Sequence, residues 1–397
     1  MDNLNLLKKE LENELKENIL SFWIDKVQDH ENGGFYGLVD NFGVPDTKFF
    51  KGCVLNSRIL WTFSKMYIFS KNDLYLKCAK RAFEFLVDAF YDKEFSGLFW
   101  TVTYDGKIKD SRKQIYNLAF GIYGLTEYYK ATKDKKSLDL AIEIFNTIER
   151  FAYDKENGGY IEALKRDYSG MSDLRLSPKD MNEKKSMNTH LHILEAYTNL
   201  IGIWKNKEII EKQRELIEIF IKKIYDNNNK SQKLFFDENW NSKTNIISYG
   251  HDIEFSWLLY EAAEVIGDDD IIKKIKDISI EVSENVLKNG IDKNGGIFNE
   301  NINGKIEGNK FWWPQAEAMV GFFNAYQLTK DDKYLDTVFS MWEYIKDKFI
   351  DKEYGEWYDT VYESGKSNKH LSKVNPWKCP YHNSRAMIEL IERIGNV

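Results

Sequence analysis

A short phrase that recurs along the chain constrains its fold more than any other feature of the sequence. The phrase combines acidic residues, glycine and aromatic residues, and it returns about every 60 residues or at twice that interval. The copies are DHENGGFYG at 29–37, YDKEFSGLFW at 91–100, YDKENGGYIE at 153–162, DKNGGIFNE at 292–300 and DKEYGEWYD at 351–359, with a degenerate copy, NKSQKLFFDENW, at 229–240. The chain therefore consists of six units of similar length.

The segments between these phrases have the apolar period of helices. NLAFGIYGLTEYYKATKD at 117–134 and KKSLDLAIEIFNTIERFAYD at 135–154 both carry apolar residues at i, i+3, i+4 and i+7. The phrase itself is typical of a tight turn leading into a short extended piece, because glycine readily adopts positive φ. Each unit is thus predicted to contribute a pair of helices.

Helix pairs can stack as an open solenoid or close into a ring. An open array needs polar capping repeats, but the last helix, PYHNSRAMIELIERI, is as apolar as the inner ones. We therefore expect an all-α fold, a closed (α/α)6 barrel with a central pocket, formed by residues 1–397 as a single domain. An open α-solenoid that serves as a docking scaffold is the alternative.

Composition and charge exclude several classes of function. The formal charge of −7 is spread along the chain, so no basic stripe or polybasic segment indicates binding to nucleic acid or to a membrane. The N-terminal segment lacks the apolar core of a signal peptide, and Cys53, Cys78 and Cys379 are too far apart to suggest a disulfide framework or a zinc site. We expect a cytoplasmic protein.

Residues suited to chemistry occur at the expected start of one helix in every unit. Since the helix starts of a closed barrel meet at one end, these side chains can line a single pocket. They are Arg58, Tyr116, Asn188 and His192, His251 and Glu254, Trp312, Trp313 and Glu317, and Trp377 and His382.

Helical spacing supports the same conclusion. His251 and Glu254 are three residues apart and Asn188 and His192 are four apart, so each pair shares a helix face. His190 points about 200° away from His192 on the helical wheel and is predicted to be a packing residue. Taken one at a time, a histidine, a Trp-Trp pair or an acidic residue in a first turn is more often structural than functional. No zinc-binding motif occurs, so we expect no metal.

Aromatic faces beside carboxylates, an amide and a guanidinium indicate a carbohydrate ligand. Glu254 and Glu317 could form the carboxyl pair of a glycoside hydrolase, although that reaction gives the histidines no role. Inversion of a carbon next to a sugar carbonyl uses them better, because it needs two bases on opposite faces. In this hypothesis His251 starts as a neutral base, Glu254 either orients it or binds a sugar hydroxyl, and Arg58, Tyr116 and Asn188 stabilise the oxyanion.

Six segments together resemble the cellobiose 2-epimerases of the N-acylglucosamine 2-epimerase superfamily. They are KGCVLNSRILW, AFGIYGLTEYY, SMNTHLHILEAYTNL, SYGHDIEFSWLL, KFWWPQAEAMVGFFNAYQ and WKCPYHNSRA. The resemblance covers nearly the whole chain. It implies an (α/α)6 barrel that acts without a cofactor on the reducing-end glucose of cellobiose, lactose and related β-1,4-linked disaccharides, and that gives the mannose epimer.

The resemblance also implies roles for individual residues. His251 and His382 match the acid/base pair at C2, and His192 matches the histidine that assists near the ring oxygen and O1. The residues matched to substrate binding are Arg58, Tyr116 and Asn188 around the enediolate, Glu254 and Glu317 on hydroxyls, and Trp313 and Trp377, with Trp312, as stacking residues. A monosaccharide enzyme, either an N-acylglucosamine 2-epimerase or an aldose–ketose isomerase, remains the alternative. The expected partner is the disaccharide alone, bound to a monomer or weak dimer.

Overall fold

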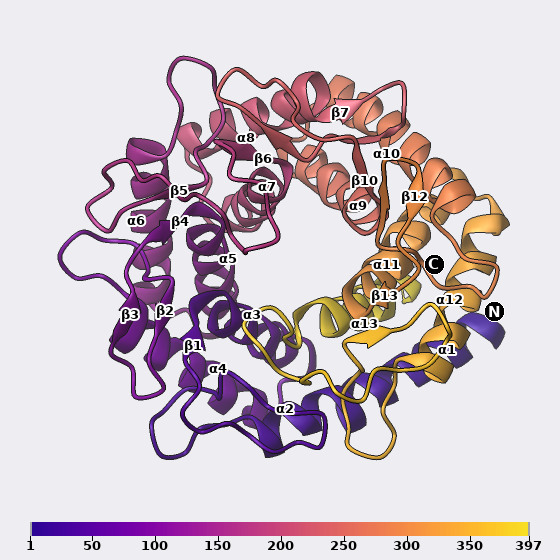
Figure 1. Cartoon of the computed structure of the whole chain (residues 1–397), viewed down its shortest axis with the longest axis horizontal. Helices are drawn as coiled ribbons and strands as arrows, with labels where there is room; N and C mark the ends of the chain where they lie inside the picture. Colours follow the sequence, from indigo (N-terminus) through magenta and orange to yellow (C-terminus); the bar gives the residue numbers. More distant parts are fainter. Residues whose placement is uncertain (1, 396–397) are drawn as a thin grey trace.

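Two concentric layers of helices form a closed ring around a central opening (Figure 1). The computed structural model describes residues 2–395. The inner helices are buried on nearly all sides, since they face both the barrel axis and the outer layer. They are α3 (Cys53–Ser70), α5 (Ile115–Thr132), α7 (Met187–Ile201), α9 (Tyr249–Ile266), α11 (Trp312–Thr329) and α13 (Tyr381–Ile394).

The outer helices are amphipathic, with one face packed on the inner ring and the other in solvent. Most begin at an Asn or Asp whose side chain accepts a hydrogen bond from a backbone N–H of the first turn. The outer layer comprises α1 (Asp2–Asn13), η1 (Glu14–Leu20) and α2 (Ser21–Lys26), α4 (Asp73–Phe85) with η2 (Leu86–Phe90), α6 (Lys135–Phe151), α8 (Lys207–Ile219) with η3 (Phe220–Ile224), α10 (Asp269–Asn289), and α12 (Asp332–Lys348).

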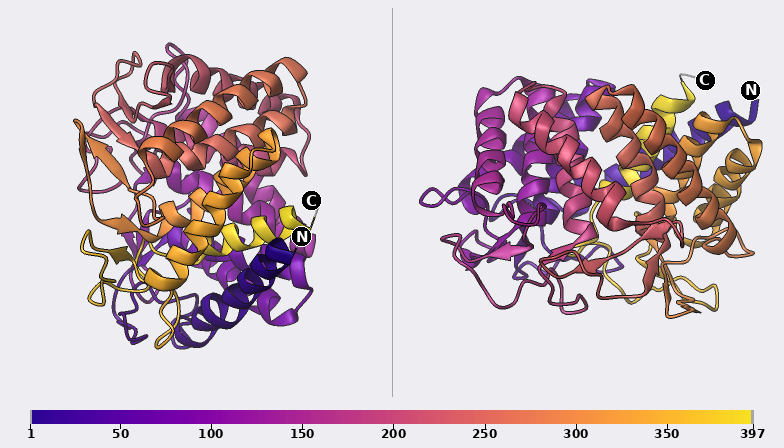
Figure 2. Two further views of the ribbon diagram at one scale, coloured as in Figure 1. Left: turned by 90° about the vertical axis from the view of Figure 1, so that its right-hand side faces the viewer. Right: turned by 90° about the horizontal axis from the view of Figure 1, so that it is seen from above.

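The ring closes where the two ends of the chain meet. The N-terminal helices α1 and η1 pack against α13, so the last inner helix receives its outer partner from the beginning of the chain (Figures 1 and 2). The predicted all-α (α/α)6 barrel is confirmed. The sequence alone had suggested no place in the barrel for the N-terminal segment.

Short antiparallel strands gather at one end of the barrel (Figure 2). In five units the strand that leads into an inner helix pairs with a strand in or directly after the next turn phrase, and these pairs are β1–β2, β4–β5, β6–β9, β10–β11 and β13–β14. The pairing fixes the start of each inner helix to the neighbouring unit. The strands are β1 (Lys51–Gly52), β2 (Thr101–Val102), β3 (Ile108–Asp110), β4 (Lys113–Gln114), β5 (Ala163–Leu164), β6 (Lys185–Ser186), β7 (Tyr225–Asp226), β8 (Ser231–Gln232), β9 (Phe235–Phe236), β10 (Ile246–Ser248), β11 (Glu300–Ile302), β12 (Lys305–Ile306), β13 (Lys310–Phe311) and β14 (Thr360–Val361).

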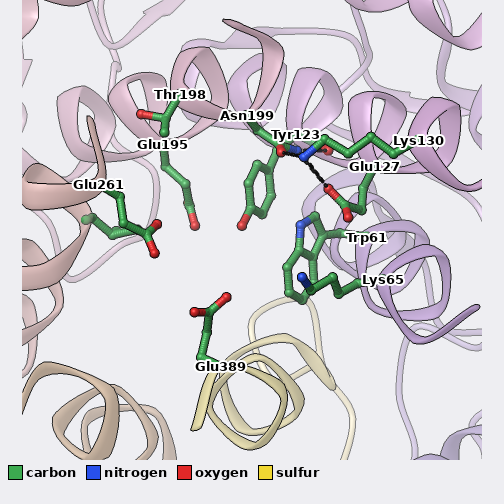
Figure 3. Close-up of a pocket in the computed structure, with 11 residues that line it drawn as sticks. Trp61, Lys65, Tyr123, Glu127, Lys130, Glu195, Thr198, Asn199, Glu261 and Glu389 are labelled. Carbon is green, nitrogen blue, oxygen red and sulfur yellow. Dashed lines mark hydrogen bonds and ion pairs between the residues drawn. The ribbon is translucent and has the colours of Figure 1, made fainter. Parts of the chain in front are cut away.

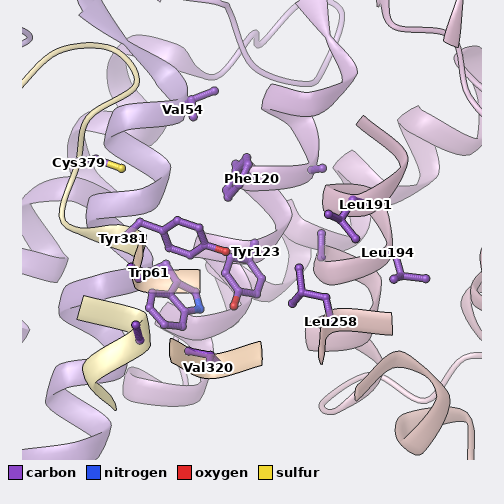
Figure 4. Packing of buried hydrophobic residues seen from close by; sticks show 14 of the residues in the cluster. Val54, Trp61, Phe120, Tyr123, Leu191, Leu194, Leu258, Val320, Cys379 and Tyr381 are labelled. Carbon is purple, nitrogen blue, oxygen red and sulfur yellow. The ribbon is translucent and has the colours of Figure 1, made fainter. Parts of the chain in front are cut away.

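Aromatic side chains fill the barrel below its strand-bearing end (Figure 4). Trp61 of α3 stacks on Tyr123 of α5, with ring centroids 5.4 Å apart. Tyr381 of α13 meets the edges of Trp61 and Phe120, at 5.3 and 5.5 Å. The barrel therefore encloses a pocket with a packed floor. Within residues 2–395, no helix is both long and apolar enough to span a bilayer.

Candidate active site

A cavity of about 470 Å³ opens at the end of the barrel where the inner helices begin. Its size lies within the range of about 300–1,000 Å³ that is usual for small-molecule sites. Each of the six inner helices contributes at least one lining residue from its first turns. The predicted site residues that line the cavity are Arg58, Tyr116, Asn188, His192, His251, Glu254, Trp312, Trp313, Trp377 and His382.

The two histidines predicted to act at C2 face this cavity from different helices. His251 lies in the first turn of α9 and His382 in the first turn of α13. The indole of Trp313 contacts both, with ring centroids 4.7 Å from His251 and 5.7 Å from His382. One ligand seated against Trp313 can therefore reach both imidazoles.

Glu317 lies behind His382 rather than on the cavity wall. It is completely buried, and its Oε1 lies 2.6 Å from Nδ1 of His382. Burial, together with the nearby Arg58 and Arg385, lowers the pKa of His382 well below its ordinary value. The neutral ring therefore donates its Nδ1–H to Glu317 and presents the lone pair of Nε2 to the cavity. The prediction that Glu317 binds a sugar hydroxyl is corrected: its position suits it to orient His382.

Arg385 connects the carboxyl groups beneath the cavity. Its Nη2 lies 2.9 Å from Glu254 and 2.6 Å from Glu317, and its Nη1 donates to Glu195 and to Tyr381. The sequence reasoning missed Arg385, although it lies three residues after His382 and so on the same helix face.

Burial raises the pKa of Glu254 well above its ordinary value, with repulsion from Glu317 adding to the effect. The pKa of Glu317 is also raised by burial, against the attraction of Arg385. Two carboxylates this close do not ionise equally, so Glu254 retains its proton more readily. Glu254 can then offer an O–H to a ligand in the cavity.

Glu254, Glu317 and His382 bring their ligand atoms within 4.8 Å of one another, as a metal site would require. However, the guanidinium of Arg385 already occupies the charged side of this cluster. A divalent cation there would lie beside a buried positive charge, so the donor set fits a metal poorly.

His251 is held by a serine. Its Nδ1 lies 2.8 Å from Oγ of Ser248, the residue that precedes α9. Of the two roles expected for Glu254, orienting His251 is therefore wrong, because Glu254 turns toward Arg385, and binding a sugar hydroxyl stays a prediction. Burial, with the nearby His192, lowers the pKa of His251 to about 3. A lowered pKa favours the neutral form that the sequence predicted for His251, with burial rather than the helix start as its main cause.

His192 repeats the arrangement of His382. Its Nδ1 lies 2.8 Å from Glu195, three residues further along α7. The spacing rule that drew attention to His251 and Glu254 would also have identified this pair. Glu195 additionally lines a second cavity of about 150 Å³ toward the opposite end of the barrel (Figure 3). His190 is confirmed as a packing residue, since its ring bonds to the backbone of Ser186 and Tyr160.

Polar atoms without a protein partner face or adjoin the cavity. Arg58 donates from Nη2 to the hydroxyl of Tyr116 at 2.7 Å. Nε of Arg58, Oδ1 of Asn188 and Nε1 of Trp312 are buried and have no hydrogen-bond partner among the described residues. Unpaired buried polar atoms are costly, so these atoms indicate a polar ligand.

A loop between β5 and β6 forms one side of the cavity mouth. Leu176, Ser177, Pro178, Lys179 and Asp180 all line the cavity. Nε2 of Gln114 holds the loop by donating to the carbonyl of Arg175 at 2.9 Å. The sequence reasoning missed these residues because nothing in a polar loop indicates which helix ends it will cover.

Comparison with known proteins gives a consistent picture. The family model of N-acylglucosamine 2-epimerase matches residues 33–386. The cellobiose 2-epimerase of Bacteroides fragilis is 42% identical over 97% of this chain and 99% of its own length. That of Dictyoglomus turgidum is 42% identical over 99% of this chain and 100% of its own. The structure of cellobiose 2-epimerase from Bacillus thermoamylovorans superimposes with a TM-score of 0.95 at 42% identity, over 98% of this chain and 100% of that one.

Proposed function

This chain belongs to the N-acylglucosamine 2-epimerase family and is a carbohydrate epimerase, an isomerase. From this premise we propose that it converts the reducing-end glucose of a β-1,4-linked disaccharide, such as cellobiose or lactose, into mannose by inverting C2. One observation carries the proposal: His251 and His382 face a single cavity from two helices, with the ring of Trp313 in contact with both.

The reaction begins with opening of the reducing-end ring, which His192 assists at the ring oxygen and O1. The C2 hydrogen then lies next to an aldehyde, and a neutral imidazole removes it through Nε2 to leave an enediolate. The imidazole on the other face, after taking up a proton from solvent, gives that proton to C2 and completes the inversion. The first imidazole then releases to solvent the proton that it took from C2, so both histidines regain their starting states before the next turnover.

Charge on the enediolate is stabilised by groups that the fold places in advance. Arg58 is buried, and the neighbouring Tyr116 and Cys379 help keep its pKa above its ordinary value, so it stays charged. Its guanidinium already bonds Tyr116, and Asn188 adds an amide to the same wall. Such preorganised donors stabilise a developing oxyanion without reorganising during the reaction.

The outer half of the cavity favours a disaccharide over a monosaccharide. Trp377 and the loop residues Leu176–Asp180 line the cavity together with the histidines. A single sugar ring that lies between His251 and His382 leaves these residues without a ligand, whereas a second ring reaches them. The names of the most similar relatives support the same choice.

The proposal is tested by incubating the protein with cellobiose in heavy water containing EDTA and following the products by NMR. We expect 4-O-glucosyl-mannose that carries deuterium at C2. Free glucose would indicate hydrolysis instead, and an unchanged sugar would indicate a scaffold. Parallel reactions with N-acetylglucosamine and mannose test the monosaccharide alternatives, and loss of turnover on adding EDTA would contradict the metal-free mechanism.

Three further expectations concern the whole protein: a cytoplasmic location, a monomer or weak dimer, and a single folding domain. Size-exclusion chromatography with light scattering at several concentrations tests the second. A single cooperative calorimetric transition would support the third, and two separated transitions would contradict it.

A further inference from the structure

The serine before α9 uses its hydroxyl unlike the serine before α7. Ser186 precedes α7, and its Oγ accepts a hydrogen bond from the backbone N–H of Thr189 at 3.1 Å, as a helix cap does. Ser248 stands at the same position of α9, but its side chain caps no backbone N–H of the helix. Its Oγ instead lies 2.8 Å from Nδ1 of His251. Ser248 has therefore exchanged a structural bond for one to the imidazole.

The three histidines of the cavity have different partners. His192 and His382 each present Nδ1 to a carboxyl group, Glu195 at 2.8 Å and Glu317 at 2.6 Å. The partner of His251 is a neutral hydroxyl. We propose that Ser248 is a positioning residue for the C2 epimerisation, which fixes the ring of His251 while keeping it free of a negatively charged partner. This inference rests on the proposed function.

A hydroxyl suits a residue that must both take up and release a proton. When Nδ1 of His251 carries a proton, as in the imidazolium and in the neutral tautomer with a free Nε2, Oγ of Ser248 accepts a hydrogen bond from it. When Nδ1 carries no proton, the Ser248 hydroxyl can donate to it instead. A carboxylate would stabilise the imidazolium much more strongly. With serine, protonated His251 remains a strong acid that readily gives its proton to the enediolate, whereas Glu317 helps His382 to retain one.

The position of Ser248 makes the contact rigid. The residue is completely buried, and it pairs with Glu300 in the β10–β11 ladder. The backbone at Ser248 is therefore held in place by the ladder. Groups that carry or can take up charge lie on the elements packed around His251, and they must stay unchanged for a pH test to be interpretable. They are Asp252 and Glu254 on α9, His192 on α7, Glu300 on β11, Glu317 on α11 and His382 on α13.

The test compares Ser248→Ala with Ser248→Thr and with Ser186→Ala as the matched control. Without its acceptor, the ring of His251 can rotate and its imidazolium is disfavoured. We expect Ser248→Ala to lower kcat for cellobiose about 10-fold to 100-fold, as misplaced catalytic groups do, with little change in KM. The limb of the kcat–pH profile that belongs to His251 should move to lower pH. Ser248→Thr, which retains a hydroxyl, should recover most of the rate.

Ser186→Ala removes a helix cap of the same kind and should lower Tm while leaving kcat within about two-fold and the pH profile in place. The inference is overturned if Ser248→Ala keeps kcat within about two-fold of the wild type. It is also overturned if the rate falls without any shift of the pH limb, since that result means a purely structural role. If the wild-type protein does not epimerise cellobiose, the proposed function itself is contradicted. That outcome is distinct from a failure of the inference about Ser248, which appears only in the variants.

Discussion

At the scale of single residues, the imidazoles of the cavity are built alike. Each ring is fixed from behind at Nδ1, by Glu195, Ser248 or Glu317, so that Nε2 is left for a ligand. A ring held at one nitrogen has a defined direction, and a carboxylate partner also defines its tautomer. The partner then decides how readily the ring holds a proton. Three residues of one type can thus take different parts in one reaction.

Replacing either histidine of the C2 pair should stop turnover. His382→Asn and His251→Asn keep a polar side chain of similar reach but remove the base, and general base catalysis contributes about 10²–10⁴-fold to a rate. We expect kcat for cellobiose to fall by at least that factor, with near-native circular dichroism. Retained activity in either variant would remove that residue from the mechanism.

The pH dependence should reflect histidines that are neutral in the free enzyme. Burial lowers the pKa of His251 to about 3 and that of His382 well below its ordinary value. A base is active when unprotonated, so a lowered pKa extends activity toward acid. We therefore expect the acidic limb of kcat/KM to lie below about pH 6.5, the ordinary histidine value. A limb above pH 6.5 in wild-type protein would contradict neutral histidines in the free enzyme.

Sequence reasoning found the residues that reach the cavity but not the ones behind them. Ten of the predicted residues line the cavity, because the repeat shows where each inner helix starts and therefore which reactive side chains lie at that end of the barrel. Ser248, Glu195 and Arg385 are equally short-range neighbours of the histidines, yet a serine, a glutamate and an arginine on a helix are common. Which neighbour orients which ring depends on side-chain directions that spacing does not give, as the wrong partner expected for His251 shows.

At the scale of elements, the repeated phrase is a buried ion-pair clamp. Its Asp pairs with a Lys that leads toward the next inner helix. In four of the five copies the Asp also accepts hydrogen bonds from backbone N–H groups of the turn, and the Lys donates to a carbonyl of the turn. The clamps are Asp29–Lys51, Asp92–Lys113, Asp154–Lys185, Asp292–Lys310 and Asp351–Lys373. The sequence predicted the turns but not their lysines, which lie 18 to 31 residues further on.

Removing the lysine of a clamp should destabilise the barrel most where the aspartate has no second cation to pair with. Lys373→Met leaves Asp351 buried without its cation, and losing one partner of a buried pair costs about 3–5 kcal/mol. Lys113→Met is the matched control, because Arg166 also binds Asp92, at 2.9 and 3.0 Å. Chemical denaturation should show a clearly larger loss for Lys373→Met than for Lys113→Met. Equal losses would mean that the lysine stems, not their charges, stabilise the turns.

At the scale of the whole molecule, ring closure depends on two segments at opposite ends of the sequence. The repeats predicted six helix pairs, and a barrel follows from their number and uniform apolarity. The outer partner of α13 could not be found in this way, because the contact between α1 and α13 joins two segments that are far apart in the sequence. Indole N–H groups also tie the N-terminal helices to α12 and to the turn phrase after it: Trp342 donates to Glu10 at 2.6 Å and Trp357 to Glu14 at 2.7 Å.

Removing residues 1–26 should therefore weaken the site as well as the fold. Leu7, Leu11 and Leu15 are buried against the barrel, and their loss exposes the outer face of α13. The same helix carries His382 and Arg385. Burying each leucine contributes about 1.5–3 kcal/mol, so the truncated chain should have a much lower Tm and little epimerase activity.

Glu10→Gln is the control for this truncation. It removes the charge that faces Lys346 of α12 at a partly exposed contact of the same N-terminal helix, and such surface pairs contribute about 0–1 kcal/mol. Its Tm and kcat should stay close to those of the wild type. If the truncated protein instead melts and turns over like the full chain, the ring is held by its inner helices alone, and α13 keeps its two site residues in place without an outer partner.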